Sequence, residues 1–169
     1  MNRKIAAGSV ALVALVALSL VVASAAAKAD FSGKWVMDKT KSVGIPNGVE
    51  YSLNITQAGD KIETETTVKG PQGERVVKDS YTADGKEGDF TPQGPQGAMG
   101  KGKRTTKWTA DGMGLDISET ATLDGPNGPA EVSATRKWTL SADGKTLTTE
   151  MIFRSEQGSQ TMKRIFVKQ

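Results

Sequence analysis

Two arginines stand in segments where every second residue is apolar, and either could meet an anion inside the protein. Arg136 and Arg164 occupy positions that can point toward the interior of a sheet. A buried guanidinium keeps its charge and needs a carboxylate, another anion or several carbonyl oxygens. Each could bind the acidic group of a ligand. Arg164 could instead cover Trp35 through a cation–π contact, the role we favour, and Arg136 could equally lie outside.

Few side chains suited to catalysis are present. The 169 residues include no His and no Cys, so the commonest general base at neutral pH is absent. Carboxylates, Tyr, Lys and Ser remain, and Glu63 and Glu65 fall on the polar face of their segment. No pair of acids is clearly brought together. We therefore expect no catalytic residue, no metal site and no cofactor, with a carboxylate-dependent enzyme as an alternative.

One segment combines glycines with basic residues. Residues 97–104 nearly match a phosphate-binding loop, but Arg104 stands where that loop requires Ser or Thr, and a Thr-rich strand follows instead of a helix. Lys101, Lys103, Arg104 and Lys107 are interpreted as a solvated strand edge that resists pairing with other chains. Contact with acidic lipid or polysaccharide is the alternative interpretation.

From residue 30 onward the sequence has the pattern of antiparallel strands. Ile62, Thr64, Thr66 and Val68 alternate with mostly charged residues, which is the period of a strand with one polar face. A long sheet with one apolar face tends to close on itself, because closure removes its exposed edges. We expect an all-β, antiparallel up-and-down meander closed into a barrel of about eight to ten strands. The strands are predicted at 32–37, 48–57, 61–69, 74–82, 86–90, 101–109, 114–123, 130–140, 145–154 and 160–168.

Two kinds of turn alternate along the chain. Short Gly-Asp or Asp-Gly turns are expected at 59–60, 84–85, 111–112 and 143–144. Longer connections rich in Gly or Pro are expected at 38–48, 70–73, 94–97, 125–128 and 157–158. In a meander these two sets fall at opposite ends of the barrel. Trp35, Tyr81, Trp108 and Trp138 lie near the short turns and are interpreted as an aromatic plug for that end.

The two ends of the domain carry a resemblance to known proteins. Gly33-Lys34-Trp35 is the Gly-x-Trp signature on a first strand, and Lys163-Arg164-Ile165-Phe166 resembles a closing strand. On these residues the chain resembles lipocalins and fatty-acid-binding proteins, and in particular bacterial secreted lipocalin-like, calycin-type domains. The resemblance implies that Gly33 and Trp35 are structural, and the place of Trp108 and Trp138 in the predicted plug gives them the same role. It also implies that an Arg-x-Tyr pair grips a carboxylate, although Phe166 stands here where the Tyr would be.

The other end of the barrel is the expected mouth. A small apolar ligand, such as a fatty acid, would enter there and meet adaptable side chains. A filled core without a ligand is the alternative. The predicted ligand-binding residues are Tyr51, Leu53, Val68, Arg136, Met151, Phe153, Met162 and Arg164.

The first 29 residues have the layout of a secretory signal peptide. Arg3 and Lys4 precede an apolar run, and Ala27-Lys28-Ala29 fits the small-x-small cleavage rule, which predicts a domain over 30–169. Removing Arg3, Lys4 and Lys28 reduces the 22 basic residues to 19, equal to the 19 acidic ones, so general nucleic-acid binding is not expected.

These observations predict an exported, monomeric carrier of a small apolar ligand, periplasmic or extracellular, that touches a membrane only through its signal peptide. A surface module that binds another exported protein is the alternative from a different class.

Overall fold

The computed structural model describes residues 27–92, 100–125 and 128–169 and contains ten antiparallel strands in that part of the chain. The predicted all-β meander is therefore confirmed, and the short segment at 86–90 lies in a strand of its own. The strands are β1 (Gly33–Met37), β2 (Glu50–Ala58), β3 (Lys61–Gly70), β4 (Gly73–Thr82), β5 (Asp84–Phe90), β6 (Gly100–Trp108), β7 (Gly114–Gly125), β8 (Gly128–Leu140), β9 (Thr146–Ser155) and β10 (Gly158–Lys168).

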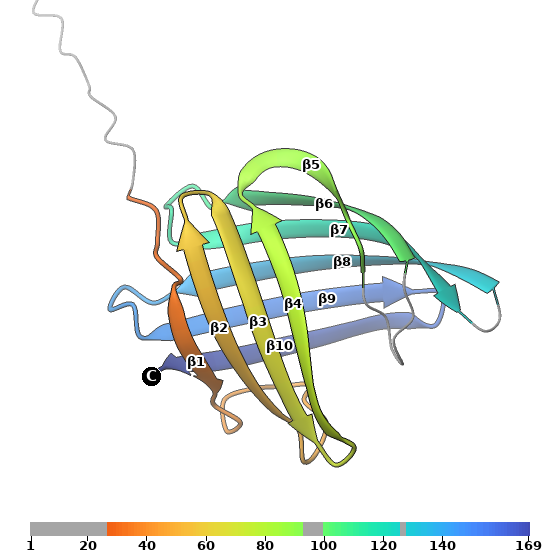
Figure 1. Cartoon of the computed structure of the whole chain (residues 1–169), viewed down its shortest axis with the longest axis horizontal. Helices are drawn as coiled ribbons and strands as arrows, with labels where there is room; N and C mark the ends of the chain where they lie inside the picture. The colour runs from red at the N-terminus through yellow and green to blue at the C-terminus, as the bar shows by residue number, and fades with distance from the viewer. Residues whose placement is uncertain (1–26, 93–99, 126–127) are drawn as a thin grey trace, which may run out of the picture.

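The strands form one sheet that curls until its two edges face each other. The hydrogen-bonded order is β4-β3-β2-β1-β10-β9-β8-β7-β6-β5, so β1 pairs with both β2 and β10. Trp35 lies opposite Lys168 and Met37 lies opposite Phe166, which confirms that the first and last strands are neighbours. In Figure 1, β1 to β4 cross β6 to β10, and β5 arches beside the end of β4. The barrel is nearly closed, with a seam between β4 and β5.

Most of the turns lie at the predicted ends of the barrel, but their lengths differ from the prediction. The tight hairpin turn expected at 84–85 is wrong, because Asp84 and Gly85 begin β5, which does not pair with β4. Gly59-Asp60 is a two-residue turn as expected, because Ala58 pairs with Lys61. The connections at 70–73 and 155–158 are also two-residue turns, although longer ones were predicted there. Gly73 and Gly158 make this possible, since their φ angles of 109° and 121° disfavour other residues. The sequence at 38–48 does form a long connection, and it contains no helix.

Aromatic side chains fill the end of the barrel where the Asp-Gly turns lie. Trp35 is fully buried, Tyr81 and Trp138 are buried, and Trp108 packs against the same cluster, which confirms the predicted plug. Sequence inspection missed the residue at its centre, Phe31, which is 0% exposed.

Phe31 connects the plug to the chain that crosses this end of the barrel. Its ring stacks on Trp108 and meets Trp138 edge-on, each with 5.9 Å between ring centroids. Its carbonyl oxygen accepts a hydrogen bond of 2.9 Å from Nε1 of Trp35. The Gln57 side chain accepts a hydrogen bond from the Phe31 amide and donates one to the carbonyl of Ala29. These contacts join the segment before β1 to the strands around it.

The folded contacts begin before the boundary expected at residue 30. Ala29 is buried, and its amide donates a 2.8 Å hydrogen bond to the carbonyl of Gly112, while Lys28 forms an ion pair with Asp60. The remainder of the expected signal helix, residues 1–26, lies outside the described residues. Within the described part of the chain no helix has the length and apolar character needed to span a bilayer.

Replacing Phe31 with Ala should lower the free energy of unfolding by about 3–5 kcal/mol, because it removes a buried ring and leaves a cavity. Urea denaturation followed by tryptophan fluorescence measures this loss. Val43→Ala is the matched control, since Val43 is 65% exposed and its truncation should leave the midpoint unchanged. Similar midpoint shifts for the two variants would contradict the central position of Phe31.

Candidate functional site inside the barrel

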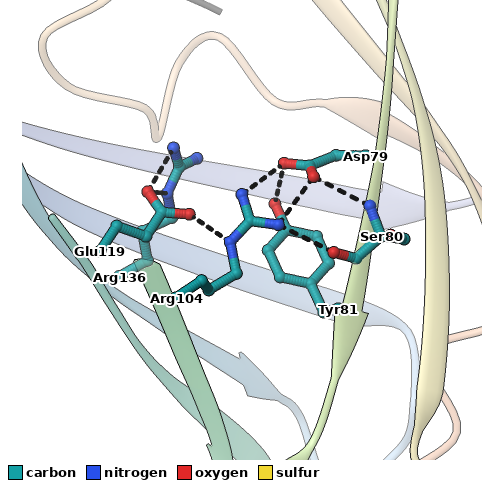
Figure 2. A network of polar contacts seen from close by, with 6 residues as sticks. All are labelled: Asp79, Ser80, Tyr81, Arg104, Glu119 and Arg136. Atoms are coloured by element: carbon teal, nitrogen blue, oxygen red, sulfur yellow. Dashed lines mark hydrogen bonds and ion pairs between the residues drawn. The ribbon is translucent and has the colours of Figure 1, made fainter. Parts of the chain in front are cut away.

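A layer of charged side chains lies inside the barrel, directly above the aromatic plug. Asp79 enters it from β4, Arg104 from β6, Glu119 from β7 and Arg136 from β8 (Figure 2). Side chains of a strand alternate between its two faces, and these four residues share a face with the core residues of their own strands. Charged side chains are buried in proteins only when they are paired, so the partner of each residue decides whether its charge is already satisfied within the protein.

Arg104 joins the two edges of the sheet. Its Nη1 and Nη2 donate to the two carboxylate oxygens of Asp79 at 2.7 and 2.9 Å, and Nη1 also donates to the carbonyl of Ser80 at 2.8 Å. Its Nε donates to Glu119 at 2.7 Å. Asp79 and Ser80 belong to β4, the free edge of the sheet, so this guanidinium supplies hydrogen bonds where no neighbouring strand does. Figure 2 shows these contacts.

The expectation that Arg104 belongs to a solvated basic edge is wrong. Lys101, Lys103 and Lys107 are exposed, whereas Arg104 is 7% exposed and points inward, because it has the opposite parity in β6. Its guanidinium lies 4.4 Å from the Tyr81 ring centroid and 4.2 Å from that of Phe90.

Gly102 makes room for the Phe90 ring beside Arg104. A Cβ at Gly102 would lie 2.5 Å from that ring, so a side chain larger than hydrogen would displace it.

Burial by itself lowers the pKa of Arg104, because it disfavours the charged guanidinium. The hydrogen bonds to Asp79 and the nearby negative groups outweigh that effect and raise the Arg104 pKa above its ordinary value.

Glu119 holds a second arginine in the same layer. One of its carboxylate oxygens accepts from Arg104, and the other accepts from Nε of Arg136 at 3.1 Å. The Glu119 side chain is 5% exposed, so both arginines depend on one buried carboxylate. Tyr81 completes the layer by donating its hydroxyl to Asp79 at 3.0 Å. Arg104, Asp79, Glu119 and Arg136 therefore form a connected network that crosses the barrel.

Arg164 differs from these two arginines because it has no carboxylate beside it. Its guanidinium lies 4.2 Å from the ring centroid of Tyr51, and Nη2 is 3.7 Å from the sulfur of Met162. Its Nε is buried and has no hydrogen-bond partner among the described residues. Burial lowers the pKa of Arg164 below its ordinary value, and the positive charge of Arg136 adds to this effect. Among the described side chains, Arg164 is thus a half-buried cation that forms no ion pair and whose Nε is buried.

An interior cavity of about 70 Å³ lies between Arg164 and the network. Its wall mixes hydroxyl groups with apolar side chains and two guanidinium groups. That volume accommodates a few waters or a small polar group, and it is smaller than the several hundred Å³ of a drug-sized ligand. The lining residues are Leu53, Thr64, Thr66, Tyr81, Arg136, Trp138, Thr149, Glu150, Met151, Arg164 and Phe166.

The structure gathers most of the predicted ligand-binding residues around this cavity. Four of them line it: Leu53, Arg136, Met151 and Arg164. Tyr51 and Met162 lie one step away, where they contact Arg164. Val68 and Phe153 are half-buried nearer the other end of their strands and do not line the cavity.

The partner of Trp35 is not the one favoured from the sequence. Lys168 lies over the Trp35 ring at 5.2 Å, and Arg164 stacks on Tyr51 instead. The register explains the difference. Lys168 is directly opposite Trp35, whereas Arg164 is two interior positions further along β10.

Sequence inspection missed Asp79, Arg104 and Glu119, although a local signal for them exists. Arg104 has the parity of Trp108, and Glu119 has the parity of Leu115, so each pattern places a charge on the apolar face of its strand.

Among residues 27–92, 100–125 and 128–169, no group of three or more His, Cys, Asp or Glu residues is arranged to hold a metal ion.

Ten solved protein chains match the fold of this chain, among them the following two. The first is the zebrafish ileal bile acid-binding protein complexed with cholic acid, with a TM-score of 0.48, 20% identity, and coverage of 82% of this chain and 98% of that chain. The second is secretory abundant heat soluble protein 4 from Ramazzottius varieornatus, with a TM-score of 0.39, 18% identity, and coverage of 82% and 94%. At these scores neither structure assigns a function. No family model and no curated protein matches the sequence.

Glu119→Gln should lower the free energy of unfolding by about 3–5 kcal/mol, because it leaves Arg104 and Arg136 without their shared buried carboxylate. Chemical denaturation at neutral pH measures the change. Glu63→Gln is the control, since Glu63 forms an exposed pair with Lys61 and its loss should not shift the midpoint. A midpoint unchanged by Glu119→Gln would show that the network contributes no stability.

The stability of the protein should fall at alkaline pH because of Tyr81. Burial raises the pKa of the Tyr81 hydroxyl above its ordinary value of about 10. Above about pH 10 the folded state therefore retains a proton that the unfolded chain loses, so the free energy of unfolding decreases as the pH rises. Between about pH 9 and about pH 11, the urea midpoint should fall more for the unmodified protein than for Tyr81→Phe. Equal decreases would contradict this prediction.

Proposed function

We propose that the protein binds a small apolar molecule with an acidic head group inside the barrel, with the head group paired to Arg164. The observation that carries this proposal is the half-buried guanidinium of Arg164, whose buried Nε has no partner among the described residues and whose neighbours are an aromatic ring and a sulfur. An uncompensated buried cation costs several kcal/mol. A ligand carboxylate in the cavity would remove that cost and accept charged hydrogen bonds.

The other two arginines support this choice by contrast. Glu119 contacts both Arg104 and Arg136, and Asp79 contacts Arg104, so these carboxylates are already engaged. A ligand anion therefore has most to gain at Arg164, and the Arg136 side chain on the same cavity wall adds positive charge. Leu53, Met151 and Phe166 give the wall its apolar part. This combination favours an amphipathic acid over a neutral lipid.

The small volume of the cavity indicates how a longer molecule would be accommodated. Met151 and Met162 lie opposite each other on β9 and β10, and each is half-buried. Methionine side chains are flexible and adapt to irregular apolar shapes. We propose that both move when the apolar part of the ligand enters, so that the cavity expands beyond its 70 Å³.

We propose a binding role instead of a catalytic one. The two interior acids, Asp79 and Glu119, accept short hydrogen bonds from arginines, and this geometry suits permanent ion pairs better than proton transfer to a substrate. The layout of residues 1–29 is that of a secretory signal peptide, which supports export to the periplasm or the cell exterior, and we propose that the protein acts there as a monomer. A membrane contact would then be limited to the signal peptide.

Arg164→Met tests the role of the unpaired cation, with dodecanoate and dodecanol as probes of the same chain length. The unmodified protein should bind dodecanoate with a saturable change in tryptophan fluorescence. In Arg164→Met the dodecanoate affinity should fall roughly 10-fold to 100-fold, the loss expected for a charged hydrogen bond, while the dodecanol affinity should not fall. Thermal unfolding should show that the variant is at least as stable, because a buried charge without a partner has been removed.

Lys163→Met is the matched control, because Lys163 is adjacent to Arg164 on β10, does not line the cavity and already pairs with Glu150. This variant should bind both probes as the unmodified protein does. Equal dodecanoate affinity in Arg164→Met would remove the head-group assignment. The absence of a saturable change with dodecanoate, dodecanol and the apolar dye ANS would overturn the carrier proposal as a whole.

A further inference from the structure

A second hollow lies at the seam of the sheet, separate in chemistry from the interior cavity. It has a volume of about 850 Å³ and is bordered by β4 and β5, the two edge strands that do not pair. Its wall contains the network residues Asp79 and Arg104, the hydroxyl groups of Thr64, Ser80 and Thr106, and the ring of Phe90. Among the described residues of its wall, Phe90 is the one large apolar side chain, which makes the described wall unsuited to a lipid tail.

One polar group in this hollow is buried and has no partner. Thr106 is 2% exposed, and its Oγ1 makes no hydrogen bond with any described residue. A buried hydroxyl left without a partner costs about 1–3 kcal/mol, and almost all such groups in folded proteins are satisfied by protein, water or a ligand. Arg104, which is also buried, has the same parity on β6 and lines the same hollow. The hydroxyl is therefore a buried donor and acceptor that a polar partner at this position would satisfy.

The charges around the hollow nearly cancel. Acidic side chains outnumber basic ones in its wall, but most of them already hold an ion pair. Four such pairs are present: Glu63 with Lys61, Glu65 with Lys78, Asp89 with Lys103, and Asp79 with Arg104. A strongly anionic ligand would meet these carboxylates. A strongly cationic one would compete with a basic side chain at four of the six carboxylates in the wall, and only Asp84 and Glu87 form no ion pair with a described residue. A neutral ligand meets neither obstacle.

The geometry points to a second binding site at the seam for a neutral, hydroxyl-rich ligand, namely a saccharide. A sugar hydroxyl donates and accepts at once, so it can accept from the Thr106 hydroxyl and donate to Asp79 or Ser80. Phe90 offers an apolar surface against which the carbon skeleton of a sugar ring can pack. This site is separate from the acid-binding site proposed at Arg164. Arg164 lines only the interior cavity, Thr106 lines only the seam hollow, and Thr64 lines both.

Titration of the full-length folded protein with neutral oligosaccharides of glucose, galactose and N-acetylglucosamine tests this proposal. Two-dimensional NMR should show saturable shifts of the Thr106 amide and the Arg104 Nε–H with at least one of them. Thr106→Val, which keeps the shape and removes the hydroxyl, should weaken that binding about tenfold, the loss expected for one hydrogen bond to a buried group. Its urea midpoint should stay the same or rise, because a buried hydroxyl without a protein partner is gone.

Thr105→Val is the matched control, since Thr105 neighbours Thr106 on β6 and faces the opposite side of the sheet. It should bind the same oligosaccharide as the unmodified protein does. Spermidine serves as a cationic competitor, and stronger binding of spermidine would overturn the neutral ligand class. A Thr106→Val variant that is less stable and binds with unchanged affinity would show that a structural water occupies the position. The absence of shifts with every oligosaccharide would also overturn the site.

Arg164→Met separates this proposal from the carrier function. It should leave saccharide binding unchanged while it weakens dodecanoate binding. If the unmodified protein bound the saccharide but not dodecanoate, only the interior site would be overturned. If it bound dodecanoate but no saccharide, only the seam site would be overturned.

Discussion

The ladder of backbone hydrogen bonds runs round the sheet from β4 to β5 and stops there. Several contacts span the remaining gap, and Arg104 supplies the charged ones, because its guanidinium contacts Asp79 and Ser80 on β4 and Glu119 on β7. A strand edge without a neighbour leaves its amide and carbonyl groups unpaired. The guanidinium satisfies one of these carbonyls and stacks on Phe90 of β5, so it links the two edges alongside the packing of Tyr81 on Trp138.

This arrangement divides the interior into layers with different chemistry. Aromatic rings centred on Phe31 close one end, and their burial contributes apolar stability. Charged groups lie above them, where the low dielectric makes paired charges stable and an unpaired one costly. Arg104 and Arg136 satisfy that condition through Glu119, whereas Arg164 does not. The same physical rule therefore explains both the internal stability of the network and the proposed affinity for an acid.

The alternation of residues allowed much of the fold to be predicted. Ile62 and Thr64 were placed on the inner face and are buried, and Trp35 and Trp138 were placed in the plug and lie there. The pattern at Arg104 was misread, because three neighbouring lysines suggested a solvated edge. Its parity with Trp108 pointed inward, but parity alone does not say whether a buried arginine has a partner. Likewise, the lengths of the turns after β3 and β9 depended on glycine backbone angles that composition does not specify.

The sequence by itself determined the strands, their inner and outer faces and the aromatic end of the barrel, because a period of two residues is a local property of the chain. The tertiary structure alone decided which charges meet. Asp79 and Arg104 are 25 residues apart and come together only because the sheet curls until its edges face each other. It also decided that Lys168, not Arg164, covers Trp35, since the register between β1 and β10 joins distant parts of the chain. Pairing between distant strands depends on closure of the whole sheet, and no local pattern encodes it.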